Sequence, residues 1–297
     1  MIIDAHHHLW KVARGDYFWM DSLADPGVAP IARDFLLEDY RALARANAIT
    51  GSILVQAAQT TAETAWLLEQ AHASEGLILG VVGWIDIAGE DARSALQAAS
   101  RDTLLRGIRP MLQDIAPDDW VLRPVLAPAF EALIELDLAF DVLIRPPQVE
   151  SAFTLLTRYP QLRAVIDHGA KPQIAQAQWQ PWADCMRRVG RETRAYCKLS
   201  GLVTEARPDW KIDDLRRYTD HLIDCFGPER LMWGSDWPVA LLASDYARWL
   251  ETAQSLISGL SVAEREEVMG GSAIRFYKLA KPQHRGTEDT EGHREKR

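Results

Sequence analysis

The sequence has little basic charge and no long hydrophobic run. Its 33 lysine and arginine residues face 42 aspartate and glutamate residues, which gives a net charge of -9. Nucleic acids and anionic membranes are bound through a basic face, so this balance argues against both as partners. No apolar run reaches the roughly 18 residues of a membrane span, and no signal peptide precedes the first predicted strand. We therefore expect a soluble protein.

Cysteine is also scarce, and its placement excludes a disulfide framework. The three cysteines, Cys185, Cys197 and Cys225, are odd in number and lack the spacing of a metal site. Free thiols of this kind are typical of a reducing compartment, so we expect a cytoplasmic protein. Length and charge say nothing about oligomeric state.

Short apolar runs alternate with segments of helical periodicity along most of the chain. Capping boxes pair Thr60 with Glu63 and Ser261 with Glu264, and Gly270-Gly271 is expected to end the last helix. Eight strands, each followed by a helix and apolar on both faces, predict a (β/α)8 TIM barrel, which commonly takes about 250 residues. The predicted strands are Ile2–Ala5, Ser52–Gln56, Leu77–Ile85, Leu105–Arg109, Ala139–Ile144, Ala164–Ile166, Ala195–Leu199 and Leu231–Gly234.

The alternative fold is a doubly wound sheet with a second, smaller domain. It is weakened because no strand is followed by a glycine-rich phosphate-binding loop, and no change in composition marks a linker. The tail, residues 281–297, has no apolar residue, and we expect it to be disordered. The sequence thus predicts one barrel domain over residues 1–280.

Polar side chains follow six of the eight predicted strands. Catalytic residues of a barrel lie at the carboxyl ends of its strands, so these side chains are the candidate site. Because side chains alternate along an extended segment, His6 and His8 share one face and His7 takes the other. The polar residues are His6, His7, His8, Arg109, Arg145, Asp167, His168, Lys198, Ser235 and Asp236.

Structural roles remain open for several of these residues. Arg109 and Arg145 could form ion pairs within the barrel, and Lys198 could neutralise a buried carboxylate there. Asp4 and Asp167 stand beside the histidines, where they could orient the imidazoles or form salt bridges.

Five motifs carry a resemblance to a known family: "DAHHHLW", "RGIRPMLQD", "DHGAKP", "CKLSGL" and "GSDWPV". Together, in this order, they resemble the amidohydrolase superfamily, and specifically its branch of sugar-lactone hydrolases, which includes L-fucono-1,5-lactonases and L-rhamnonolactonases. The resemblance extends from the first strand to "SAIRFYKLA", near residue 280. It implies an amidohydrolase-like barrel.

The resemblance also implies a metal site. His6, His8, His168 and Asp236 match the positions that hold a divalent ion, typically zinc, in metal-dependent relatives. Imidazole and carboxylate groups suit zinc on chemical grounds as well. Arg109 stands where binuclear relatives have a carboxylated lysine, and Arg145 where they have a histidine. We therefore expect one zinc ion or a metal-independent enzyme, and no binuclear centre.

Hydrolysis of a lactone needs an activated water, stabilisation of an oxyanion and protonation of the departing alkoxide. Asp236 is the expected general base. Arg109, His168 or a zinc ion would stabilise the oxyanion. Arg145 and Lys198 are donors suited to sugar hydroxyls or to the product carboxylate.

Tryptophan is abundant near the predicted strand ends, where its rings could cover the apolar face of a sugar. Trp19, Trp84 and Trp237 are the expected substrate contacts among the 11 tryptophans of the chain. Residues 11–30, after the first strand, lack a clear helix, and we expect them to cover the barrel mouth.

The expected partner is thus a small sugar lactone. Two alternatives remain open. One is another reaction on the same barrel, either hydrolysis of a non-sugar lactone or metal-dependent decarboxylation. The other is a sugar-binding barrel without catalytic activity.

Overall fold

The protein is described here by a computed structural model, which covers residues 1–20 and 26–280. Its strands form one parallel sheet whose spatial order is the chain order, and every predicted apolar run overlaps an observed strand. The eight strands are β1 (Ile3–His7), β2 (Gly51–Val55), β3 (Ile78–Gly83), β4 (Leu105–Ile108), β5 (Ala139–Val142), β6 (Ala164–Ile166), β7 (Tyr196–Leu199) and β8 (Leu231–Trp233).

The two outer strands of this sheet meet just beyond their carboxyl ends. The amide of His8 donates to the carbonyl of Trp237 at 2.7 Å, and the amide of Asp236 donates to the carbonyl of His6 at 2.8 Å. The sheet is therefore a nearly closed barrel, and the predicted (β/α)8 fold is confirmed. β1 runs to His7 instead of ending at Ala5, because His7 still pairs with Leu54 of β2.

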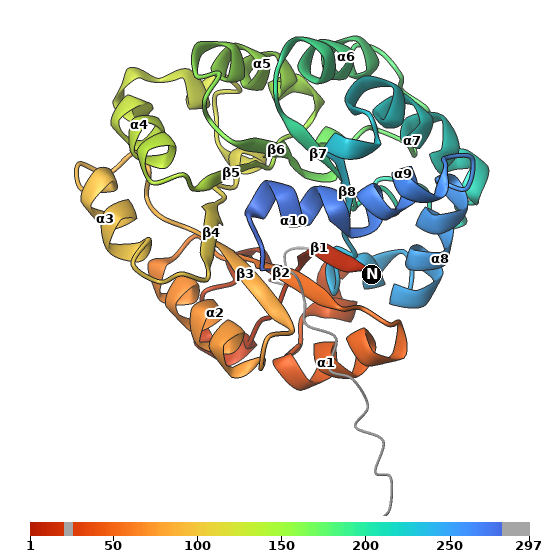
Figure 1. Ribbon diagram of the computed structural model, residues 1–297, viewed down its shortest axis with the longest axis horizontal. Coiled ribbons are helices and arrows are strands. Elements are labelled where there is room, and N and C mark those ends of the chain that lie inside the picture. The colour runs from red at the N-terminus through yellow and green to blue at the C-terminus, as the bar shows by residue number, and fades with distance from the viewer. Residues whose placement is uncertain (21–25, 281–297) are drawn as a thin grey trace, which may run out of the picture.

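Helices surround the barrel, and α9 and α10 lie across one end of it (Figure 1). Apolar side chains fill the layer between the strands and the outer helices, as the apolar runs require. The helices are α1 (Leu37–Ala46), α2 (Thr61–Ala73), α3 (Ala92–Ala99), α4 (Ala127–Glu135), α5 (Val149–Arg158), α6 (Trp182–Glu192), α7 (Ile212–Phe226), α8 (Tyr246–Leu256), α9 (Val262–Glu266) and α10 (Ser272–Tyr277).

The short helix α10 closes the floor of the barrel, at the amino ends of the strands. A Cβ atom on Gly270 would lie 3.2 Å from Cγ1 of Ile3, the first residue of β1, so glycine permits this close approach. Ala273, Phe276 and Tyr277 then pack with the apolar side chains that point into the barrel. The opposite end, where the carboxyl ends of the strands meet, is left for the candidate site.

The structure corrects two details of the predicted helix ends. The helical structure does not end at Gly270-Gly271 as predicted, because a π-helical turn over Glu267–Gly271 leads from α9 into α10. The Ser261–Glu264 capping box is confirmed. In the other box Thr60 accepts from the amide of Glu63, but the Glu63 carboxylate reaches past it to the amides of Ala57 and Ala58.

The segment between β1 and α1 contains three short 3-10 helices, at Val12–Arg14, Phe18–Met20 and Pro26–Ile31. Residues 21–25, part of the segment expected to cover the mouth, lie outside the described residues, and so does the tail expected to be disordered. Among the described residues, no helix is both long enough and apolar enough to cross a membrane.

Candidate active site

Three strand ends bring His6, His8, His168 and Asp236 together at the barrel mouth. We call these four residues the histidine–aspartate cluster. Oδ1 of Asp236 lies 3.4 Å from Nε2 of His8, and 3.8 Å from Nε2 of both His6 and His168. All four side chains are buried. The positions expected to hold a metal or to act in catalysis are therefore close together in space.

Hydrogen bonds to the far side of two rings decide which ring nitrogen faces the aspartate. Nδ1 of His8 lies 2.8 Å from the carbonyl oxygen of Val55. A carbonyl can only accept, so Nδ1 carries the proton, and Nε2 presents a lone pair to Asp236. Nδ1 of His168 lies 2.8 Å from Oγ of Ser200, which leaves its Nε2 free to face Asp236 as well.

Backbone conformations that are uncommon for residues with a side chain place two members of the cluster. Asp236 has φ 56° and His168 has φ 53°, both in the left-handed region. Such conformations are found most often at functional sites, where the surrounding structure holds them in place. Here the amide of Asp236 is bonded to β1, as described above, and its carbonyl accepts from the amide of Ala240 at 2.9 Å.

The pKa values of the cluster favour neutral imidazoles and an ionised carboxylate. Burial lowers the pKa of His168 to about 4, and it also lowers the pKa of His8. Burial alone would raise the pKa of Asp236, but the His168 and His8 rings outweigh it and hold this pKa below its ordinary value. Near neutral pH the Asp236 carboxylate can therefore accept a proton.

The guanidinium of Arg109 reaches the cluster from the end of β4. Its Nη1 atom lies 3.2 Å from Nε2 of His6 and 3.3 Å from Oδ2 of Asp167. Nη2 donates to the carbonyl of Gln56, whose side-chain amide in turn donates to the carbonyl of Arg109 at 2.7 Å. The arginine is thus an almost fully buried cation held beside the histidine–aspartate cluster.

Lys198, which was expected to contact substrate, lies beneath His6 and has no exposed surface. Its Nζ atom is 2.5 Å from Oδ2 of Asp141, 2.9 Å from Oδ1 of Asp167 and 3.0 Å from Nδ1 of His6. The carboxylates of Asp141 and Asp167 bind the ammonium group, which is why Lys198 does not reach the mouth as expected. Lys198 therefore acts on the ring of His6 from behind, out of reach of a molecule in the mouth.

Asp141 is a member of this arrangement that the sequence reasoning missed. Its only signal was one carboxylate inside the otherwise apolar strand β5. Burial raises the pKa of Asp141 despite the Lys198 charge. Burial would also raise the pKa of Asp167, but Lys198, His6 and Arg109 hold it well below the ordinary value. Two buried cations, Lys198 and Arg109, thus stand beside two buried carboxyl groups.

The remaining predicted contacts lie at different depths. Trp19 donates from Nε1 to the carbonyl of Ala57 at 2.7 Å and lines a hollow of about 290 Å³. Trp84 is half-buried. Trp237 is buried, with its ring packed against Phe35 and Tyr40. The hollow beside Trp19 is lined by Asp16, Phe18, Trp19, Ala57, Ala58, Gln59, Thr60, Met111 and Asp114.

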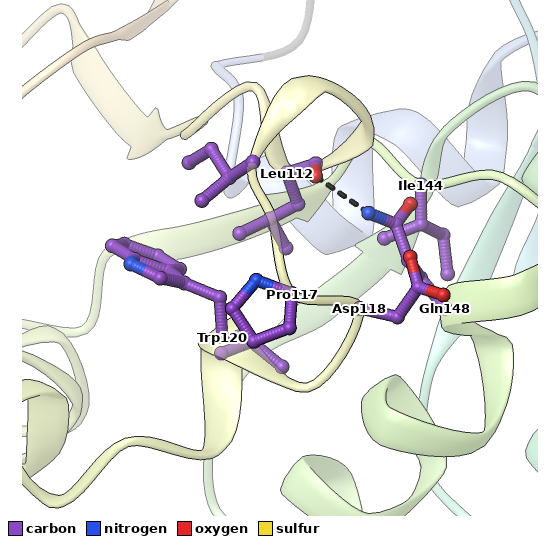
Figure 2. A pocket seen from close by; sticks show the side chains of 8 residues that line it. Leu112, Pro117, Asp118, Trp120, Ile144 and Gln148 are labelled. Atoms are coloured by element: carbon purple, nitrogen blue, oxygen red, sulfur yellow. Dashed lines mark hydrogen bonds between the residues drawn. The ribbon is translucent and has the colours of Figure 1, made fainter.

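Arg145 is the most exposed of the predicted site residues. Its side chain is 57% exposed, and Nη2 lies 3.8 Å from Oδ1 of Asp114. Gln148 fixes the backbone there: it accepts from the amide of Arg145 at 2.9 Å and donates to the carbonyl of Leu112 at 2.7 Å. Figure 2 shows this bond across a small pocket between the segments that follow β4 and β5. The Arg145 side chain is therefore exposed while its backbone is anchored.

Among the described residues, the other histidines lie away from the cluster. Nε2 of His7 lies 3.0 Å from Oγ of Ser52, and its ring stacks on Tyr40 at 3.6 Å. His72 lies on α2 and His221 on α7, both outside the barrel.

The donor set of the cluster fits a divalent cation. Ligand atoms of His6, His8 and Asp236 lie within 4.8 Å of one another. The Nε2 lone pair of His8 faces a carboxylate oxygen without a proton between them, and a cation stabilises such a pair. A second set, His6, Asp167 and His168, meets the same distance limit.

Comparison with known proteins agrees with this geometry. The chain is 39% identical over 284 residues to an L-fucono-1,5-lactonase of Burkholderia ambifaria, covering 94% of this chain and 96% of the relative. It is 37% identical to an L-fucono-1,5-lactonase of Burkholderia multivorans, covering 94% and 97%. A crystal structure of a zinc-bound amidohydrolase from Burkholderia multivorans superposes with a TM-score of 0.87 at 36% identity, covering 94% of this chain and all of that one.

Structures of 5-carboxyvanillate decarboxylases also share the fold, for example one from Sphingomonas paucimobilis at 15% identity with a TM-score of 0.66. At that level of identity only the fold is comparable. The model of the amidohydrolase family matches residues 3–279, nearly the whole barrel. This chain therefore belongs to the amidohydrolase family.

Proposed function

We propose that this protein hydrolyses a sugar lactone, such as L-fucono-1,5-lactone, to the aldonic acid. The observation that carries the proposal is a buried, ionised Asp236 beside three imidazoles and the Arg109 guanidinium, at the mouth of a barrel. The two lactonases that match almost the full length of the chain supply the substrate class.

In the proposed reaction Asp236 accepts a proton from water as the oxygen of that water attacks the lactone carbonyl. The carbonyl oxygen becomes an oxyanion, which Arg109 and His168 stabilise by charge and hydrogen bonding. When the ester bond breaks, Asp236 returns the proton to the departing ring oxygen. The products are a carboxylate and a hydroxyl group on one open chain.

Zinc is the metal we propose for the histidine–aspartate cluster, with His6, His8, His168 and Asp236 as its ligands. A zinc ion bound there would supply a Lewis acid near the lactone carbonyl. The zinc-bound relative supports this assignment. Asp236 accepts and returns the proton in the scheme above whether or not zinc is bound.

We propose that Arg145 and the half-buried Trp19 and Trp84 contact the sugar. Arg145 has an exposed guanidinium that can donate to hydroxyl groups or to the product carboxylate. Lys198 and Trp237, which are buried, would support the site from behind. We also propose that the protein acts in carbohydrate metabolism and in the cytoplasm. The three free cysteines support the cytoplasmic location.

A screen of aldonolactones with a pH indicator tests this function directly, since each turnover releases a proton. We expect turnover of at least one 1,5-lactone well above the spontaneous rate. Turnover of aromatic or other non-sugar lactones, without turnover of any aldonolactone, would show that the proposed substrate class is wrong. Absence of turnover on every lactone, with and without added zinc, would refute the function.

A further inference from the structure

A chain of buried polar groups connects the floor of the barrel to His6. The hydroxyl of Tyr277, in α10, donates to Oδ2 of Asp141 at 2.7 Å. Lys198 donates to the same Oδ2 atom and lies 3.0 Å from Nδ1 of His6. We call Tyr277, Asp141, Lys198 and His6 the buried charge chain. None of its side chains is exposed. The first member of this chain, Tyr277, belongs to the helix α10 that crosses the floor of the barrel (Figure 1).

Tyr277 decides how the Asp141 carboxylate is held. Oδ2 of Asp141 receives both the Tyr277 hydroxyl and the Lys198 ammonium, while Oδ1 has no hydrogen-bond partner among the described residues. Without the hydroxyl, the carboxylate could turn and present either oxygen to the lysine. The long lysine side chain would follow, because its ammonium is placed by its carboxylate partners.

The position of Lys198 in turn decides the orientation of the His6 ring. An ammonium group can only donate, so its contact with Nδ1 of His6 requires a lone pair on that nitrogen. The opposite ring nitrogen, Nε2, then faces Nε2 of His8 and Nη1 of Arg109, each at 3.2 Å. Loss of the lysine contact would leave the orientation of the ring unfixed.

We propose that Tyr277 is a positioning residue for the active site: through Asp141 and Lys198 it fixes the orientation of the His6 ring. It touches no molecule in the mouth and acts from the opposite end of the barrel. The inference rests on the proposed function for its kinetic readout, but its spectroscopic readout is independent of any substrate.

Tyr277→Phe is the informative variant, because it removes the hydroxyl and keeps the ring that packs on Phe276. Tyr196→Phe is the matched control. Its ring also packs on Phe276 at the same floor. Its hydroxyl accepts from Nε of Arg275 at 3.4 Å and forms no hydrogen bond with the four residues of the buried charge chain.

The first measurement is the long-range ¹H–¹⁵N spectrum of the histidine rings in the full-length protein. The His6 signals are assigned by their absence in His6→Gln. We expect Tyr277→Phe to shift the His6 ring nitrogens, and Tyr196→Phe to leave them in place. Unchanged His6 signals in folded Tyr277→Phe would overturn the proposal.

The second measurement is a double-mutant cycle on kcat and KM with Asp141→Asn. Loss of a group that orients an active-site ligand typically costs roughly 10-fold or more, so we expect Tyr277→Phe to lower kcat about 10-fold with little change in KM. The double variant should be no slower than Asp141→Asn alone, because both substitutions cut the same chain. Fully additive losses would contradict the proposal.

These outcomes separate the two proposals. If the wild-type protein turns over no lactone, the proposed function fails, while the His6 spectrum still decides the role of Tyr277. If Asp141→Asn does not fold, the comparison of Tyr277→Phe with Tyr196→Phe is unaffected and remains decisive.

Discussion

Replacement of Asp236 by asparagine tests the proposed general base. The amide keeps the shape of the carboxylate, and its N–H group can donate to the Nε2 lone pair of His8, which lies 3.4 Å from Oδ1. The variant loses the ability to accept a proton, together with the negative charge that makes Asp236 a proposed zinc ligand. General acid–base catalysis supplies roughly 10²–10⁴-fold in rate, so we expect Asp236→Asn to lower kcat by at least that factor. This corresponds to about 2.7–5.4 kcal/mol in the activation free energy.

The folded protein should tolerate this substitution with some loss of stability. The pKa of Asp236 lies below its ordinary value in the folded state, so the ionised carboxylate stabilises the fold above that ordinary pKa. Asparagine removes this contribution, and we expect a lower Tm at neutral pH than in the wild-type protein. At a pH below the folded pKa of Asp236 the difference in Tm should shrink.

The assay follows proton release from an aldonolactone near neutral pH, with spontaneous hydrolysis subtracted. His7→Asn is the control on the same strand, because its ring points away from the cluster toward Ser52 and Tyr40. We expect it to cost far less activity than Asp236→Asn. Near-full lactonase activity in folded Asp236→Asn would refute Asp236 as the base, and the proposed mechanism with it.

Three further predictions concern stability, metal binding and domain extent. Burial raises the pKa of Glu63 to about 7. The folded state therefore holds this proton more tightly than the unfolded state does. As pH rises from 4.5 to 7, the unfolding free energy of the wild-type protein should fall relative to that of Glu63→Gln by up to about 3 kcal/mol. A constant difference between the two unfolding free energies over this range would contradict the prediction. Calorimetric titration of chelator-treated protein should show one zinc per chain, bound more weakly by His8→Asn; equal affinity would exclude His8 as a ligand. Truncation after residue 280 should leave lactonase activity and Tm unchanged, because the tail has no apolar residue to bury; loss of folding would refute the domain boundary.

The barrel could be predicted from the sequence because a strand that is buried on both faces must consist mainly of apolar residues. Runs such as Ile78–Gly83 are apolar on both faces, which only a sheet covered on both sides requires. The cluster could be located for a related reason: a barrel brings all its strand ends to one rim, so polar residues after strands converge whatever their separation in sequence.

What could not be predicted depends on contacts across the barrel. The residue types alone left two roles open for Lys198, and only the positions of Asp141 and Asp167 around it decide between them. The same holds for Trp237, because its packing on Phe35 joins the segment before α1 to the segment after β8. The role of α10 was missed because its apolar residues look like those of any short amphipathic helix, and the sequence does not show how closely the preceding Gly270 approaches β1.

The floor helix α10 has a consequence for how the protein is made. Every residue of the histidine–aspartate cluster precedes residue 237, yet Tyr277 reaches Asp141 across 136 positions of sequence. A nascent chain emerging from the ribosome therefore carries the whole cluster before it carries the hydroxyl that holds Asp141 and, through it, Lys198. Because domains fold from the amino terminus during synthesis and long-range contacts form late, the site acquires its final geometry only when the last helix arrives. Translation that stops short of α10 would yield a chain with every proposed catalytic residue and an unfinished active site.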